Sequence, residues 1–141
     1  MVICFLTSQL IFNVMKYKNN PLNIRATKSK WIGVTGVKNG FLEFESVVYG
    51  VRCGLFLLKR TYKRWYGCCD LEKCIITFAP PTENDTESYI RFVVKESGVA
   101  RGTIVWFMSR DMWYRVLKAM CKIESNYKLS RETFDKAFDL V

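Results

Sequence analysis

Residues 47–66 form the stretch that most limits what this chain can fold into. Its apolar side chains recur at steps of three and four, the spacing of one face of an α-helix; they are Val48, Val51, Leu55, Leu58, Tyr62 and Trp65. Ser46 stands where a helix N-cap is expected, and Gly67 follows where helices commonly end. The spacing therefore predicts one long amphipathic helix over 47–66, packed against a core along a single face.

Four later segments carry similar start and stop signals. The residues that can cap them are Asp70, Asn84 or Asp85, Ser109 and Ser130. Pro80-Pro81 stops the first of these helices, and Gly98 lies just past the end of the second. We expect helices over 71–78, 86–97, 110–124 and 131–140.

A small hairpin is predicted ahead of these helices. Asn19-Asn20-Pro21 and Lys38-Asn39-Gly40 are typical of turns. The expected arms are 31–35 and 41–44, although Phe41 and Phe44 do not share a strand face. With strands and helices segregated along the chain, the predicted fold class is α+β, mostly α, in one domain.

Charge and residue content limit the chemistry. The 141 residues carry a formal net charge of +9, which favours polyanions: nucleic acid, anionic lipid or an acidic cell-wall polymer. Arg52, Lys59, Arg60, Lys63 and Arg64 lie mostly off the apolar face of 47–66 and form either a solvated flank or a polyanion contact surface. With no histidine, Ser-His and Cys-His nucleophile pairs are excluded, so catalysis would use carboxylates, Tyr, Lys or Cys.

The cysteines predict neither a metal site nor a disulfide framework. There are six, and no C-x-x-C spacing occurs among them: Cys4, Cys53, Cys68, Cys69, Cys74 and Cys121. We expect reduced, mostly buried thiols, and no metal or cofactor.

The N-terminal stretch "MVICFLTSQLIFNVM" is apolar and uncharged. It is too short to span a bilayer as a helix, and it lacks the basic region of a signal peptide. We expect 1–17 to be a packed helix or an extension, with Met15 as an alternative start, and 18–141 to form the domain.

Several motifs resemble a family from phage and Bacteroidales genomes that is labelled a phage or virion structural protein. The matching stretches are "NNPLNIR" (19–25), Trp31, "GFLEFES" (40–46), Gly50-Val51-Arg52 and "FAPPTENDTESYI" (78–90). The family pattern reads N-N-P-G-N-I-R, W-x-G, F-x-x-F-x-S, G-x-R and W-A-P-P-x-E-N-x-T-x-x-Y. The resemblance covers roughly 18–126, and the chain departs from it at Leu22 and Phe78.

The same middle part is similar to lysozyme-like glucosaminidases and lytic transglycosylases, which cut peptidoglycan. In that family a catalytic Glu near a helix end precedes an N-N-x-F-x-I-K stretch, a Trp, a hairpin ending in F-x-x-Y-x-S, a long helix and a T-D-x-x-Y motif. Here nothing acidic precedes residue 19. However, "KAMCKIESNY" (118–127) resembles the transglycosylase stretch in which an apolar helix delivers E-S-x-F/Y. The resemblance thus implies a circularly permuted lysozyme-like domain with Glu124 as its acid.

The resemblance also implies the remaining site residues. Tyr89 would contact the sugar or the intermediate, and Glu43 or Glu45 would be the second carboxylate that a hydrolase needs but a transglycosylase does not. The implied substrate-binding residues are Asn19, Asn20, Asn23, Trp31, Asn84, Asp85 and Thr86. Most have a structural alternative: a solvated helix-end residue for Glu124, plain strand charges for Glu43 and Glu45, a core aromatic for Tyr89, turns for the early asparagines, and helix caps for 84–86.

Two functions are therefore predicted. The first is a peptidoglycan-cleaving glycosidase of phage or mobile-element origin, whose partner is the glycan strand and whose location is a virion or cell envelope. The second is a non-catalytic lysozyme-like virion structural or cell-wall-binding protein, which would contact other virion or envelope proteins. A nucleic-acid binder would fit the charge but matches no motif here.

Overall fold

The computed structural model describes residues 15–141, so most of the segment predicted as an N-terminal helix or extension lies outside the described residues. In chain order the elements are β1 (Val34–Lys38), β2 (Phe41–Phe44), α2 (Val47–Phe56), the π-helical segment η1 (Leu57–Thr61), α3 (Tyr62–Tyr66), α4 (Leu71–Phe78), α5 (Thr86–Ser97), the 3-10 segment η2 (Val105–Phe107), α6 (Arg110–Ser125) and α7 (Arg131–Phe138).

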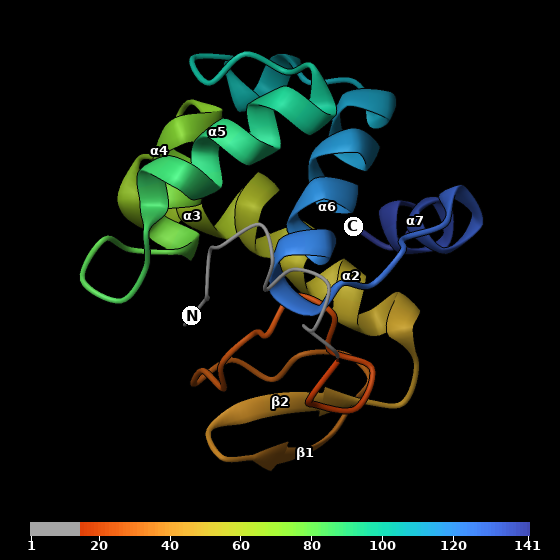
Figure 1. Cartoon of the computed structure of the whole chain (residues 1–141). Helices are drawn as coiled ribbons and strands as arrows, with labels where there is room; N and C mark the ends of the chain where they lie inside the picture. Colours follow the sequence, from red (N-terminus) through yellow and green to blue (C-terminus); the bar gives the residue numbers. More distant parts are fainter. Residues whose placement is uncertain (1–14) are drawn as a thin grey trace.

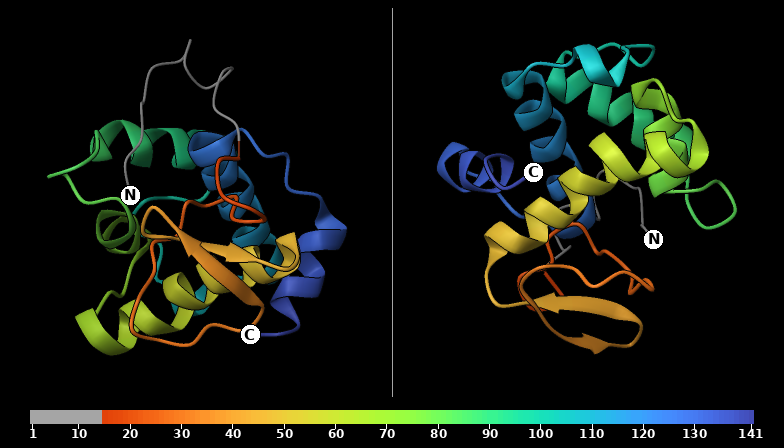
Figure 2. Two further views of the ribbon diagram at one scale, coloured as in Figure 1. Left: turned by 90° about the horizontal axis from the view of Figure 1, so that it is seen from below. Right: turned by 180° about the vertical axis from the view of Figure 1, so that it is seen from behind.

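The helices form one body, and the antiparallel hairpin lies against one end of it (Figure 1). Helix α6 packs on α5 and also contacts α7, while α7 packs on α2. The right-hand view of Figure 2 shows the hairpin below the helices, where β2 leads into the start of α2. The predicted α+β, mostly helical fold is confirmed.

The helix starts follow the capping signals in the sequence. The side chains of Asp70, Asp85, Ser109 and Ser130 each accept a hydrogen bond from the backbone N–H three residues later. Ser46 occupies the N-cap position of α2 but makes no side-chain cap hydrogen bond. The predicted helices agree with the structure to within one or two residues, since α6 extends to Ser125 and α7 ends at Phe138.

The hairpin turn lies where it was predicted, but its first arm starts later. Asn39 and Gly40 both have positive φ, 52° and 83°, as a two-residue hairpin turn requires. Gly33 has φ 81°, and the ring of Trp31 packs edge-on against Phe56. Residues 31–33 therefore form a turn that leads into β1 rather than strand, which corrects the predicted arm 31–35.

The predicted helix 47–66 is continuous, but a π-helical segment interrupts its α-helical pattern at 57–61. Two sequence predictions on it were wrong. Trp65 is exposed although it continues the apolar stripe, because every residue from 63 to 67 extends beyond the core. Arg52 is buried instead of lying on a solvated basic flank, because α7 packs on α2 and the Arg52 side chain donates to the Leu140 carbonyl.

Large side chains fill the core between these layers. The largest fully buried residues include Trp113, Tyr89, Phe44, Phe78 and Phe134. All five cysteines within the described residues are free, and all but Cys69 are buried, as predicted. Burial raises the pKa of the Cys74 thiol to about 12, so this thiol is a core group and not a nucleophile.

Close packing of the segment 19–23 against α2 depends on Gly50. A Cβ added to Gly50 would collide with the backbone carbonyl oxygen of Asn19 and press on Pro21. We expect Gly50→Ala to lower the free energy of unfolding by about 1–3 kcal/mol, because backbone atoms cannot yield as a flexible side chain can. Urea denaturation measures this change. Gly36→Ala is the control, since nothing lies near a Cβ at Gly36; equal losses in the two variants would contradict the predicted collision.

Candidate functional site

Glu124 lies in the last turn of α6, and its side chain is only 5% exposed. Asn126 ends the helix in the left-handed conformation, with φ 53°. The side-chain amide of Asn23 donates to Glu124 twice, to the backbone carbonyl at 2.9 Å and to Oε1 of the carboxyl at 3.2 Å. The carboxyl is therefore held inside the protein rather than solvated at a helix end, which was the alternative left open by the sequence.

The loop that carries Asn23 is rigidly built. The side-chain amide of Asn20 donates to the carbonyls of Ile24 and Leu42, and its oxygen accepts from the Ile24 N–H. Asn23 itself has φ 51°, a left-handed conformation that asparagine tolerates. Ser125 completes the contact by donating its hydroxyl to the Pro21 carbonyl at 2.8 Å. The loop and the end of α6 thus form one joined unit.

Tyr89 approaches the same carboxyl from α5. Its side chain is completely buried, and its hydroxyl is near enough to Glu124 for each group to shift the pKa of the other. The position of the Tyr89 hydroxyl, however, does not meet the geometric criteria for a hydrogen bond to Glu124. Within residues 15–141, three buried oxygens of this cluster have no hydrogen-bond partner: Tyr89 Oη, Glu124 Oε2 and Asn23 Oδ1. Buried polar atoms are seldom left unpaired, and the Tyr89 hydroxyl and the Glu124 carboxyl lie near enough to pair with each other or through a water molecule.

The electrostatics of the cluster favour a neutral carboxyl. Burial raises the pKa of Glu124 from its ordinary 4.5 to about 8, because removal from water disfavours the charged form. The Asn23 amide and the Tyr89 hydroxyl act in the opposite direction but do not cancel the effect of burial. Burial and the nearby Glu124 also raise the pKa of Tyr89. At neutral pH, Glu124 therefore retains a proton that it can donate.

Most of the other predicted substrate-binding residues have structural partners. Asn19 donates to the Phe44 carbonyl, and the Trp31 indole N–H donates to Thr27 Oγ1. Asp85 caps α5, and the Asn84 amide donates to the Pro80 carbonyl. The buried Thr86 hydroxyl donates to the carbonyl of Ala79. The structure thus brings Glu124, Tyr89 and Asn23 together, and it gives the others roles in turns, caps and packing.

Glu43 and Glu45 stand on or just after β2 and do not enter the buried cluster. Leu42 and Phe44 alternate with them and point into the core, so the two glutamates lie on the opposite face of the strand. The Glu43 carboxylate accepts from the backbone N–H of Lys18 at 2.9 Å, and Glu45 is exposed.

Sequence reasoning missed Ser125 as a member of the site. Its hydroxyl ties the end of α6 to the loop that presents Asn23, and the residue is 3% exposed. A signal was present, because Ser125 is the second residue of the E-S pair in the motif "IESNY".

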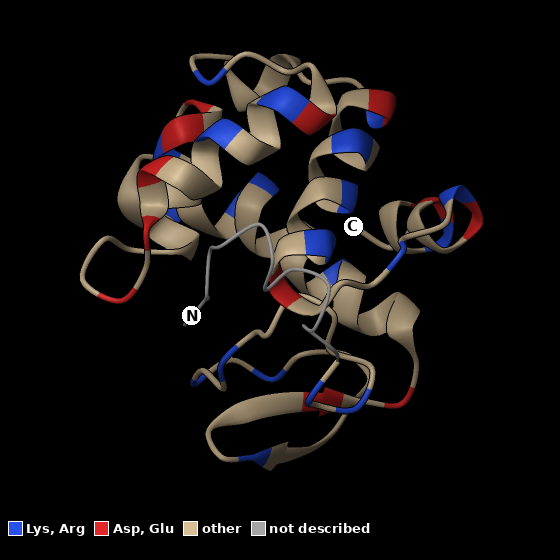
Figure 3. Ribbon diagram, in the orientation of Figure 1, with Lys and Arg blue, Asp and Glu red and all other residues tan. Residues whose placement is uncertain are grey.

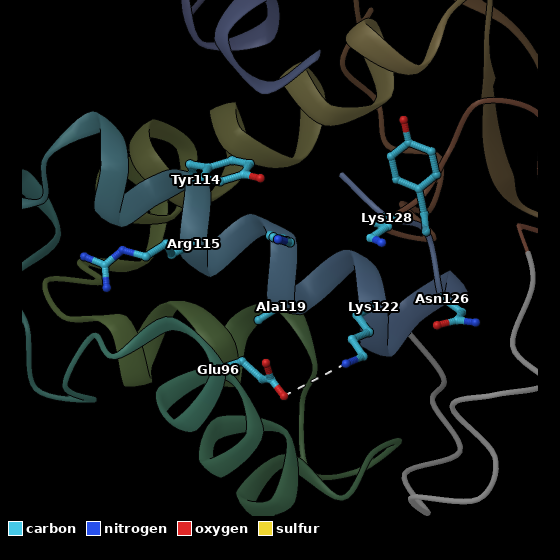
Figure 4. Close-up of a pocket in the computed structure, with 9 residues that line it drawn as sticks. Glu96, Tyr114, Arg115, Ala119, Lys122, Asn126 and Lys128 are labelled. Carbon is cyan, nitrogen blue, oxygen red and sulfur yellow. Dashed lines mark ion pairs between the residues drawn. The ribbon is translucent and has the colours of Figure 1, made fainter. Parts of the chain in front are cut away.

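A cavity of about 630 Å³ lies along α6, between it and the end of α5 that carries Glu96 (Figure 4). It is lined by Glu96, Tyr114, Arg115, Lys118, Ala119, Lys122, Asn126, Tyr127 and Lys128. The basic residues of α6 recur along the helix face seen in Figure 3. Glu124 follows Lys122 by two residues, which places its side chain about 200° around the helix. The cavity is therefore a basic surface groove that does not open onto the buried carboxyl.

Comparison with known proteins gives one informative relative. No protein-family model matches the chain. The chain is 36% identical over 112 residues to "Protein P5" of Pseudoalteromonas phage PM2, covering 76% of this chain and 68% of that protein. A similarity of this extent confirms the predicted association with phages, while the finer resemblances to a virion structural family and to lysozyme-like enzymes stay predictions.

Within residues 15–141, no helix is long and apolar enough to cross a bilayer. The chain thus combines an α+β fold and a buried Asn23–Tyr89–Glu124 cluster with sequence similarity to a phage protein. This chain belongs to the family of Protein P5 of Pseudoalteromonas phage PM2.

Proposed function

We propose that this protein is a peptidoglycan-cleaving glycosidase of phage or mobile-element origin, with Glu124 as its general acid. The observation that carries the proposal is a buried carboxyl, with its pKa raised to about 8, in a cluster where three polar oxygens lack partners. A carboxylic acid kept neutral at physiological pH is what protonation of a glycosidic oxygen requires.

The proposed reaction uses each member of the cluster. The Glu124 proton passes to the glycosidic oxygen as the bond from that oxygen to the sugar C1 breaks, and the leaving sugar departs with a hydroxyl group. Water then adds to C1 in a hydrolase, whereas a hydroxyl of the same sugar adds in a lytic transglycosylase; in either case the proton of the adding hydroxyl returns to the Glu124 carboxylate. Asn23 orients the carboxyl through its 3.2 Å hydrogen bond, and Tyr89 offers an unpaired hydroxyl to the sugar or the intermediate.

Long-range contacts support the proposed circular permutation. Asn23 meets Glu124 and Pro21 meets Ser125, so the end of α6 adjoins the loop that leads to the hairpin. In a lysozyme-like domain of ordinary order, the acid-bearing helix would precede that loop in the chain. Here the same neighbours in space come from residues 101 and 104 positions apart.

Access to the carboxyl is the demanding step. Because Glu124 is only 5% exposed, a sugar reaches it only after the side chains over it move. The same observation favours a second candidate, a non-catalytic virion structural or cell-wall-binding protein. Such a protein would keep the cluster as part of its fold without using it for catalysis. In either case we place the protein in a virion or at the bacterial envelope, with peptidoglycan as its partner.

The test is release of muropeptides from purified peptidoglycan sacculi by the full chain. We expect wild-type release, and we expect Glu43→Gln and Glu45→Gln to divide the two enzyme classes. Loss of release in either variant indicates a hydrolase with two carboxylates, whereas full release in both indicates that neither glutamate is the second carboxylate. Wild-type protein that binds sacculi and releases nothing would support the non-catalytic candidate instead.

A further inference from the structure

Four large aromatic side chains are exposed on two segments of the chain that pair with each other just beyond them. Trp65 and Tyr66 end α3 and are 72% and 70% exposed, while Trp106 and Phe107 lie in η2 and are 51% and 77% exposed. We call these four residues the aromatic tip. Exposed apolar groups of this size, gathered in one patch, usually mark an interaction site.

Backbone pairing holds the two halves of the aromatic tip together. An isolated bridge joins Asp70 to Ile104, and the Val105 N–H donates to the Cys69 carbonyl at 3.0 Å. Val105 and Met108 are buried on either side of Trp106 and Phe107, so these two aromatics are pushed outward by their anchored neighbours. Lys63, on α3, places its ammonium 4.7 Å from the centre of the Trp106 ring.

The surroundings of the aromatic tip are strongly basic. Lys63 and Arg64 are exposed just before Trp65 in the chain, and Arg60 is exposed one helical turn earlier, with its guanidinium 6.0 Å from the centre of the Phe56 ring. We call these three residues the basic collar. The sequence has no Asp or Glu from 46 to 69 or from 97 to 110, the two stretches that build this region. The aromatic tip thus has cations next to it, and the acidic residue nearest to it in the chain is Asp70, whose side chain caps α4.

We propose that the aromatic tip docks on an anionic lipid bilayer, with its rings at the level of the headgroups and the basic collar on the lipid phosphates. Trp and Tyr prefer the boundary between water and hydrocarbon, and basic residues next to them are attracted to anionic headgroups. This is surface attachment and not spanning. It is a membrane-binding site independent of the Glu124 cluster, and it goes beyond the proposed glycosidase.

Charge and shape decide against the other occupants. A second copy of this chain would bring one basic collar onto another in a symmetric contact, which like charges oppose. A nucleic-acid strand would fit a groove that tracks its backbone. The aromatic tip instead protrudes, and none of its residues lines the 630 Å³ groove described above. A protruding apolar patch with cations beside it fits a lipid bilayer, whose surface can deform around the inserted side chains.

The experiment measures binding of the full chain to phosphatidylcholine vesicles with and without phosphatidylglycerol. We expect binding to the anionic vesicles that weakens as salt rises, with a blue shift of tryptophan fluorescence. A Trp106→Ala/Phe107→Ala variant should bind about tenfold more weakly. Lys63→Gln and Arg64→Gln should each cost about fivefold. Ile32→Ala/Val37→Ala is the matched control, because these exposed apolar residues lie at the hairpin, and it should bind like wild type.

Several results would overturn the proposal. Failure of the wild-type protein to bind anionic vesicles is one, and equal loss in the hairpin control is another. Capture of a single-stranded oligonucleotide that the Trp106 and Phe107 changes abolish, without vesicle binding, would assign the patch to nucleic acid. Thermal melts of each variant ensure that weaker binding reflects the surface and not unfolding.

Discussion

Glu124→Gln should reduce muropeptide release from purified sacculi by a factor of about 10² to 10⁴, the usual worth of a general acid. Glutamine has nearly the same shape as a protonated glutamic acid and keeps an oxygen that can accept from the Asn23 amide. It has no proton that it can transfer to a leaving oxygen. The fold should therefore survive while turnover is lost, and release is followed by chromatography of the soluble products.

Glu132→Gln serves as the control for this prediction. Its side chain is highly exposed on α7, where it pairs with Lys136 one turn away, so its removal should leave the release rate unchanged. Undiminished release by the Glu124→Gln protein would exclude Glu124 from the mechanism, and with it the argument from circular permutation. Circular dichroism of both variants must match wild type for the comparison to be valid.

Stability should fall as pH rises from about 5 to about 8, because the pKa of Glu124 is raised in the folded protein. Below the ordinary value of 4.5, the carboxyl is protonated in both states and has no effect on their balance. Between 4.5 and about 8 the unfolded chain releases this proton while the folded chain keeps it, so each pH unit costs about 1.4 kcal/mol. The whole loss, complete above about pH 8, is at most about 5 kcal/mol.

Urea denaturation of wild type and Glu124→Gln across this pH window measures the effect. The variant cannot titrate at this position, so the difference between the two profiles isolates Glu124 from the other groups. We expect the variant to become progressively more stable than wild type as pH rises. Profiles that stay parallel from pH 5 to pH 8 would mean that Glu124 is ionised normally in the folded protein, and they would remove the basis of the proposed general acid. The exposed Glu45 offers a second control, since Glu45→Gln should follow the wild-type profile.

The helices were predictable from the sequence because their signals are local. Asp70, Asp85, Ser109 and Ser130 start helices by bonding groups three residues away, and a local rule is enough to find them. The π-helical segment at 57–61 gave no such signal. The burial of Arg52 also had no local signal, because it depends on contacts with the C-terminal end of the chain, where Leu140 accepts its hydrogen bond. Periodicity shows which face of a helix is apolar, but not where the core stops, which is why Trp65 was misplaced.

The candidate site was predictable only in part. The resemblance of residues 118–127 to a stretch in which an apolar helix delivers an E-S pair pointed to Glu124, and burial at the end of α6 explains its raised pKa. Its neighbours Asn23 and Tyr89 came from the family resemblance, because no local pattern relates residues so far apart. The same resemblance also named Asn19, Asn20 and Asn84, whose side chains satisfy backbone groups of their own turns or of the hairpin.

The joining of the loop at 19–23 to the end of α6 has a consequence for how the protein is made. Its contacts close a loop of about a hundred residues, and ordering so long a loop is entropically costly until the intervening helices have formed. The Glu124 cluster should therefore assemble late in folding. On the ribosome it cannot form before Ser125 has been synthesised and has left the exit tunnel. A nascent chain would carry its proposed acid only after most of its fold was in place, so any cell-wall activity would be withheld until the protein was nearly complete.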